Sequence, residues 1–288
     1  MINLIYPCLW FDGNGKEAAS FYAGIFPDTK IGSESAMVVT VDTNGQKLML
    51  LNGGPLFKPN PSVSFLIANE DEKETERLYR ELIKGGAALM PLEVYPFSKK
   101  YGWVMDKYGI SWQLYTGDSG ATTQYLIPTL MFINKQNGRA KEAIGFYTAL
   151  FPGSKTENIL EYPEGGGDTP GNVQHAQFHI SGYTLGAMDS SLNHPFDFNE
   201  AISLVVECDT QEEIDHFWNA LTADGGAESM CGWLKDKFGL SWQIIPTRLS
   251  QLMAAGNPEA SGRMMEALMK MKKLDIAALE AAYNEGVK

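Results

Sequence analysis

Cysteine is scarce in this sequence, and the few cysteines present form no pattern typical of a disulfide or a zinc site. Cys8, Cys208 and Cys231 are the only three in 288 residues; they lie far apart, and no CxxC pair occurs. A disulfide framework or a cysteine zinc site needs paired, closely spaced cysteines. We therefore predict three reduced, buried thiols in a cytoplasmic protein.

Long apolar runs and an excess of basic residues are also lacking. No uninterrupted apolar stretch approaches the roughly 18–20 residues that cross a bilayer. The first residues, MINLIYPCLWFDGNG, have neither the basic start nor the small-residue cleavage site of a secretory signal. Lys and Arg number 23 against 35 Asp and Glu, a net charge of −12, and the densest basic cluster, Lys270, Lys272 and Lys273, is small. Such a surface repels phosphates, so we expect no nucleic-acid and no membrane partner.

The sequence does contain an internal repeat, which sets its organisation. The segment FDGNGKEAASFYAGIFPD at 11–28 returns as FINKQNGRAKEAIGFYTALFPG at 132–153, and GWVMDKYGISWQL at 102–114 returns as GWLKDKFGLSWQI at 232–244. Matches at both ends of a unit indicate a duplicated domain. The length agrees, because a chain of 288 residues is expected to hold about two domains.

Each copy shows the same order of predicted elements. An apolar strand at 4–11, or about 126–133, precedes a helix whose apolar residues recur at i, i+3, i+4 and i+7. A hairpin follows, turning at Asn44-Gly45 or Ser181-Gly182, where positive φ is tolerated. Another strand, a second helix ending at Gly85-Gly86 or Gly225-Gly226, and a last hairpin complete the unit. This order predicts an α+β fold with a mixed sheet and its helices on one face.

Four segments resemble the PhnB-like branch of the vicinal oxygen chelate superfamily, which is often labelled 3-demethylubiquinone-9 3-methyltransferase and is related to glyoxalase I and the bleomycin-resistance proteins. They are PCLWFDGNGKEAASFYAGIFP, HAQFHISGYTLGAMD, DKFGLSWQIIPT and the tail KKLDIAALEAAY. The resemblance implies tandem domains, each of paired βαβββ modules forming a cupped mixed sheet. We place the first glyoxalase-like domain at 1–117, a linker at 118–124, the second domain at 125–247 and a helical C-terminal tail at 248–288.

The metal site that the resemblance implies lacks its usual ligands here. The superfamily's first-strand His matches the position around Pro7 and Pro128, and its last-strand Glu matches Gln113 and Gln243. The middle positions fall near Leu50 or Asn52 and Ser64 in the first copy, and near Ala187 or Asp189 and Ser203 in the second. Divalent ions prefer His, Cys or several carboxylates. We therefore expect no cofactor, and a divalent metal is the disfavoured alternative.

The histidines do not supply the missing metal ligands. All four, His175, His179, His194 and His216, lie in the second half. His175 and His179 are spaced for a shared ion only on a helix, whereas their segment is predicted as a strand, where four residues span roughly 13–14 Å. His216 lies off the apolar stripe of its helix and is predicted to be solvated.

The remaining candidates for a ligand cleft come from strand alternation and loops. If Trp112 and Trp242 pack under the helices, Gln113 and Gln243 point into the cups, where an amide both donates and accepts hydrogen bonds. His175 and His179 share one strand face, Asp189 ends a cup strand, and His194 lies in a loop predicted to overhang the second cup. The alternative for each is structural: a hydrogen bond to a neighbouring strand, a turn or a solvated surface.

We therefore predict a metal-free protein that binds or sequesters a small molecule, as a monomer or a homodimer. One alternative is a lyase- or isomerase-type enzyme with a divalent metal in the second domain only, held by His175 or Asp189 together with Gln243. Another is an interaction protein whose clefts are filled by side chains. Methyl transfer is the weakest alternative, because no strand, Gly-rich loop and helix of the S-adenosylmethionine-binding type is present. The sequence does not identify the ligand.

Overall fold

The computed structural model describes residues 4–118, 120 and 122–285. Positions 119 and 121 of the predicted linker, residues 1–3 of the first predicted domain and residues 286–288 of the predicted tail lie outside this part. The chain forms two compact units, one of Tyr6–Ile202 and one that joins Leu4 and Ile5 to the chain from Ser203 onward. The predicted domains were cut at the sequence repeat, and the compact units divide the chain at other points.

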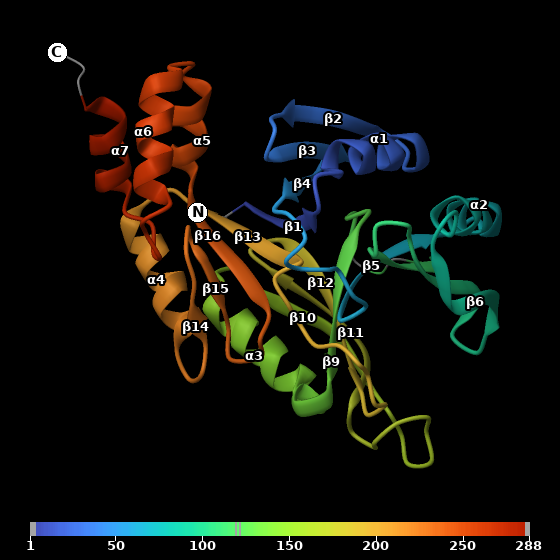
Figure 1. Ribbon diagram of the computed structural model, residues 1–288. Coiled ribbons are helices and arrows are strands. Elements are labelled where there is room, and N and C mark those ends of the chain that lie inside the picture. The colour runs from blue at the N-terminus through green and yellow to red at the C-terminus, as the bar shows by residue number, and fades with distance from the viewer. Residues whose placement is uncertain (1–3, 119, 121, 286–288) are drawn as a thin grey trace. The chain divides into compact units, whose positions relative to one another are not determined.

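The Tyr6–Ile202 unit contains strands β1 to β12 and helices α1 to α3 (Figure 1). Elements of the first repeat are β1 (Ile5–Phe11), α1 (Gly15–Ile25), β2 (Thr29–Glu34), β3 (Val38–Thr43), β4 (Gln46–Asn52), β5 (Val63–Asn69), α2 (Glu72–Leu82), β6 (Ala87–Tyr95), β7 (Ser98–Met105) and β8 (Ser111–Thr116). Elements of the second repeat are β9 (Ile127–Ile133), the 3-10 turn η1 (Asn134–Gln136), α3 (Ala140–Leu150), β10 (Lys155–Glu161), β11 (Val173–Ile180) and β12 (Tyr183–Ser190).

One sheet of this unit joins the two repeats. Its strand order is β10-β11-β12-β9-β5-β8-β7-β6. The central pair is β5 and β9, which run antiparallel with Ser64 opposite Thr129. Inside each module the first and last strands along the chain pair in parallel, β5 with β8 and β9 with β12. The predicted α+β fold with paired βαβββ modules in mixed sheets is confirmed, but the second module of the first repeat pairs with the first module of the second repeat rather than within its own repeat.

The helices cover one face of this sheet. Trp112 of β8 packs against Phe65, Tyr22 and Phe26, and Thr116 bonds Thr75 of α2. On the other half of the sheet, Phe178 of β11 stacks on Tyr147 of α3. Because the strand register places these sheet residues on the same side, the alternating residues face away from α2 and α3. The prediction that Trp112 packs beneath the helices is therefore confirmed.

The second unit contains β13 (Ile202–Cys208), α4 (Gln211–Thr222), β14 (Ala227–Glu228), β15 (Trp233–Lys235), β16 (Ser241–Pro246), α5 (Thr247–Ala254), α6 (Pro258–Leu268) and α7 (Ile276–Asn284). Its strands are ordered β14-β15-β16-β13, with β13 and β16 parallel. The predicted stripe of α4 is buried in full: Ile214, Phe217, Trp218 and Leu221.

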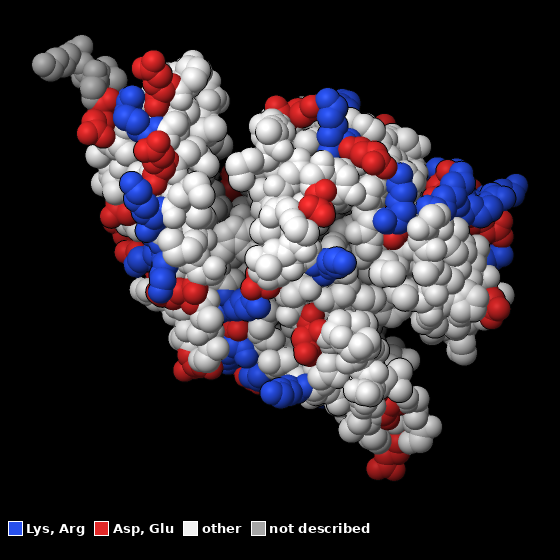
Figure 2. Space-filling view, in the orientation of Figure 1, with Lys and Arg blue, Asp and Glu red and all other residues white. Residues whose placement is uncertain are grey.

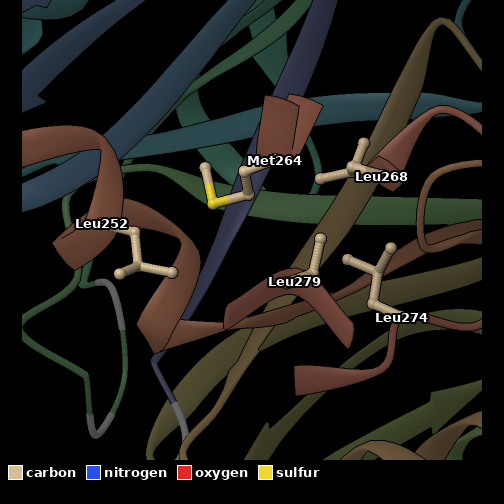
Figure 3. Packing of buried hydrophobic residues seen from close by; sticks show 5 residues of the cluster. All are labelled: Leu252, Met264, Leu268, Leu274 and Leu279. Atoms are coloured by element: carbon tan, nitrogen blue, oxygen red, sulfur yellow. The ribbon is translucent and has the colours of Figure 1, made fainter. Parts of the chain in front are cut away.

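The second unit has a shortened hairpin, and the C-terminal tail bonds next to it: the backbone N–H groups of Cys231 and Gly232 donate to the carbonyls of Met271 and Lys272. Between Gly86 and Gly102 the first repeat builds the long β6–β7 hairpin, whereas the matching stretch between Gly226 and Gly232 is ten residues shorter and holds only β14. In this unit the tail forms its own apolar cluster, shown in Figure 3: Leu252, Met264, Leu268, Leu274 and Leu279. Cys231, two residues before β15, and Ile245 of β16 pack against that cluster, so the tail packs on this part of the sheet. Cys231 is consequently half-buried, while Cys8 and Cys208 are buried as predicted.

On the face shown in Figure 2, acidic and basic side chains lie interspersed, and no large area carries charges of one sign only. None of the described helices is long and apolar enough to span a membrane.

Candidate functional site

The sheet that runs from β10 to β6 has one face turned away from α2 and α3; it carries three of the six candidate side chains, Gln113, His175 and His179, and we call it the polar face. It is built by strand alternation, since residues opposite one another in register share a face. Its members across the strands are His175, Gln177 and His179 of β11, Thr184 of β12, Thr129 of β9, Ser64 of β5, Gln113 of β8, and Tyr101 and Trp103 of β7. Gln113 and the two histidines, assigned to separate cups from the sequence, thus lie on one sheet.

The amide of Gln113 is held on both sides by protein groups. Its Oε1 accepts a hydrogen bond from the Tyr101 hydroxyl at 2.7 Å, and its Nε2 donates to Ser64 Oγ at 2.7 Å. The side chain is only 4% exposed. Gln113 therefore lies on the face opposite Trp112, and the hydrogen bond from the buried Tyr101 fixes the orientation of its amide oxygen.

Gln177 presents the opposite case, and it was not among the predicted site residues. It is 5% exposed, yet its buried Nε2 has no hydrogen-bond partner among the described residues. Gly120 lies against it, since a Cβ there would sit 3.5 Å from Gln177 Oε1. A buried amide without a partner costs about 1–3 kcal/mol. The only sequence signal for Gln177 is its place between His175 and His179 on an alternating strand.

The two histidines beside Gln177 differ in their surroundings. His179 is 8% exposed; its Nδ1 lies 3.0 Å from Thr184 Oγ1, and its Nε2 lies 3.4 Å from a Glu157 carboxylate oxygen without a hydrogen bond. His175 is half-buried, and burial lowers the pKa of its imidazole. His175 therefore favours its neutral form, which both donates and accepts.

A pH dependence of stability follows from His175. Because the folded-state pKa lies below the unfolded value of about 6.5, protonation favours the unfolded chain, and stability falls as pH drops below about 6.5. We expect the urea midpoint to decrease on going from pH 7 to pH 5, and the decrease to be smaller in His175→Gln. His194, whose pKa is also lowered by burial, accounts for part of the loss that remains. An identical pH dependence in the variant would contradict this assignment.

Asp189 and His194 have contacts away from the polar face. The Asp189 carboxylate accepts backbone N–H groups from Gly138 at 2.8 Å, Ala140 at 3.2 Å and Val173 at 2.8 Å. It thus caps the start of α3, a position that favours negative charge. His194 lies in the loop after β12, where its Nε2 is 3.0 Å from Ser190 Oγ and its ring lies against Phe196.

Gln243 lies on β16 in the other unit. It is 4% exposed, and its Nε2 donates to Ser203 Oγ at 3.0 Å, which repeats the bond between Gln113 and Ser64. The strand pairing of Trp233 with Gln243 also repeats that of Trp103 with Gln113. The tyrosine that directs Gln113 has no counterpart, because Cys231 stands at the matching position.

The residues on the polar face do not fit the divalent metal of the superfamily. Pro128 lies opposite Phe65 and hence on the helix side, and the neighbouring Thr129 occupies the polar face. Thr129, Ser64 and the amides of Gln113 and Gln177 offer only neutral oxygen atoms, which are weak ligands for a divalent cation. No group of three or more His, Cys, Asp or Glu side chains suited to an ion occurs within the described residues. Of the proposed metal set of His175 or Asp189 with Gln243, the Asp189 carboxylate caps the start of α3, and Gln243 lies on β16 of the second unit.

Comparison with known proteins identifies the family. A family model described as 3-demethylubiquinone-9 3-methyltransferase matches residues 3–115 and 124–245. The chain belongs to this family. The double match covers both repeats and confirms the resemblance drawn from the sequence.

Solved structures place this family member within the glyoxalase-like fold. Glyoxalase I from Zea mays is 14% identical and aligns over 88% of this chain and 98% of its own, with a TM-score of 0.58, which shows a shared fold. A single-repeat relative, a putative 3-demethylubiquinone-9 3-methyltransferase, PhnB protein, from Bacillus cereus, is 35% identical over 38% of this chain and 96% of its own, with a TM-score of 0.36. Protein PA1353 from Pseudomonas aeruginosa is 24% identical over 38% and 92%, with a TM-score of 0.33. The chain has no match among curated proteins.

Proposed function

We propose that this family member binds a small organic molecule on the polar face of the β10–β6 sheet, through hydrogen bonds and without a metal ion. The observation that carries the proposal is the contrast between two buried amides on that face. Gln113 is satisfied on both sides by Tyr101 and Ser64, whereas Gln177 Nε2 is buried without a described partner. Buried polar groups in folded proteins are nearly always hydrogen-bonded, so Gln177 calls for an acceptor from outside the described chain.

The residues around Gln177 indicate which chemical groups the ligand would carry. Gln177 Nε2 is a donor, and the neutral His175 beside it supplies both a donor and an acceptor. Met188 shares the strand face of Gly186, which pairs with Gln177, and Trp103 pairs with Gln113, so apolar surface is present on the same face. We propose a ligand with a carbonyl or carboxylate oxygen on an apolar body.

Methyl transfer is not proposed for this chain. The name of the Bacillus cereus relative carries that activity, but the sheet here is mixed, with α2 and α3 on one face. Nucleotide-type cofactors are commonly held at the carboxyl ends of a doubly wound parallel sheet. The polar face therefore suits binding or sequestering better than that reaction.

A matched pair of glutamine variants tests the proposal on stability. Gln177→Leu removes an unpartnered amide of similar shape, so we expect the ligand-free protein to be unchanged or up to about 1 kcal/mol more stable. Gln113→Leu leaves the buried Tyr101 and Ser64 hydroxyls without their partner, and we expect a loss of about 2–4 kcal/mol. Urea unfolding of the two variants beside the parent chain measures both. A large loss in Gln177→Leu would show that its amide is satisfied within the protein.

Native mass spectrometry of protein purified without chelator tests the binding itself. We expect an organic molecule on the parent chain that is absent from Gln177→Leu, while His216→Gln on the exposed side of α4 serves as the control that keeps it. A transition-metal ion present at one per chain would contradict the metal-free binding mode.

A further inference from the structure

An open cavity of about 600 Å³ lies at the tip of the β6–β7 hairpin, next to Tyr101 at the edge of the polar face. Its walls are the hairpin residues 94–99, the chain that leaves β8 at 115–118, and Glu70 at the end of β5. All of these residues belong to the Tyr6–Ile202 unit. The volume is in the range of cavities that hold small molecules.

Aromatic rings form one wall of this cavity. Tyr95 and Phe97 stack with centroids 5.5 Å apart, and both meet the ring of Tyr101 edge-on, at 5.6 and 5.2 Å. Phe97 is nevertheless 49% exposed and the adjacent Val94 76% exposed. A rigid, half-exposed aromatic surface of this kind is available to an apolar partner.

Carboxylates also line this cavity. Glu70 and Asp118 line the cavity together with a single cation, Lys99. No ion pair joins these three side chains to one another or to another described residue, and Asp118 Oδ1 accepts only the N–H of Gly120 at 2.9 Å. The wall thus carries one excess negative charge, in keeping with the net charge of −12 of the chain.

We propose that this cavity binds an organic cation, an ammonium group carried on an aromatic or other flat apolar body. The ammonium would pair with Glu70 and Asp118, since charge-assisted hydrogen bonds to carboxylates are the strong ones. The body would lie on Phe97 and Tyr95, whose ring faces also attract cations. This inference goes beyond the proposed function, because it concerns another site, another ligand charge and none of the residues Gln177, His175 or His179.

Three probes that share a benzene ring and carry a positive, a neutral or a negative head group test the proposal: benzylammonium, benzyl alcohol and benzoate. Each is titrated into the full chain, with isothermal calorimetry for affinity and amide chemical shifts for location. We expect benzylammonium to bind at least 10-fold more tightly than the other two and to shift the amides of 94, 95, 97–99 and 115–118. Equal binding of benzyl alcohol, tighter binding of benzoate, or shifts confined to β11 would each overturn the proposal.

Variants at exposed positions separate the two parts of the site. The double variant Glu70→Gln, Asp118→Asn keeps the shape of both side chains, and we expect it to lose at least 10-fold in affinity for benzylammonium. Phe97→Ala is expected to weaken benzylammonium and benzyl alcohol alike. Glu93→Gln, on β6 but outside the lining, is the control and should bind as the parent chain does. An unchanged affinity in the double variant would overturn the role of the carboxylates, and thermal melts of each variant confirm that it is folded.

Discussion

Replacing Asp106 by alanine is expected to destabilise the protein by about 3–5 kcal/mol, because a buried group that organises four donors is lost. The carboxylate accepts the Tyr22 hydroxyl at 2.8 Å, Trp112 Nε1 at 2.9 Å, and the backbone N–H groups of Tyr108 and Ile110 at 2.8 and 3.0 Å. Asp106 is 2% exposed, so water does not replace it in the folded chain. Its removal leaves four donors unpaired, three of them in buried bonds.

The second repeat makes the same arrangement at Asp236. That carboxylate accepts Trp242 Nε1 at 2.8 Å and the backbone N–H groups of Phe238 and Leu240 at 2.9 and 3.1 Å. The aspartate at the first position of a turn therefore serves two purposes: it closes the turn and anchors the indole of the following strand.

Urea unfolding followed by tryptophan fluorescence checks the Asp106 prediction. Asp106→Asn keeps the shape but offers one acceptor oxygen, so we expect an intermediate loss of about 2–3 kcal/mol. Asp12→Ala, at an exposed position, is the control and is expected to stay within about 0.5 kcal/mol of the parent. A loss at Asp106 no larger than at Asp12 would contradict the account of this turn.

Leu274→Ala is expected to cost about 2–5 kcal/mol in the second unit, the range for emptying a buried leucine site. Leu274 is fully buried in the cluster with Met264, Leu268 and Leu279, all four labelled in Figure 3. It also covers Gly232, where a Cβ would lie 3.2 Å from Leu274 Cδ1. The substitution therefore weakens the attachment of the tail helices to β15 and β16.

Hydrogen exchange locates the effect of Leu274→Ala. We expect faster exchange throughout α6 and α7 at a urea concentration where the parent chain is still protected. Met269→Ala, at a side chain that is 66% exposed, is the control and should leave exchange unchanged. Protection of α6 and α7 in the leucine variant equal to the parent's would show that the cluster does not hold the tail.

Local features of the fold could be predicted because neighbouring residues determine them. Asn44-Gly45 and Ser181-Gly182 form the predicted turns with positive φ at all four positions, from 45° to 81°. The alternation around Trp112 correctly gave the face of Gln113. The pairing of β5 with β9 could not be predicted. The two repeats contain equivalent strands, and the apolar pattern of a strand does not show which of them becomes its neighbour in the sheet.

In the candidate site too, local geometry could be predicted and contacts between distant residues could not. A spacing rule placed His175, Gln177 and His179 on one side of a strand, and β11 has that geometry. Asp189 was expected near the cup because it ends a strand, yet its carboxylate accepts N–H groups of Gly138 and Ala140 at the start of α3 and of Val173 on β11. Gln177 was not predicted as a site residue. Whether a buried amide finds a hydrogen-bond partner depends on its neighbours in the folded protein, and these cannot be read from the sequence.

A crystal structure of the chain purified without chelator tests the central claim most directly, through the density next to Gln177 Nε2. The account predicts an organic molecule with an acceptor atom within about 2.7–3.2 Å of that nitrogen. An ion gripped by three or more side-chain donors on the polar face would contradict it.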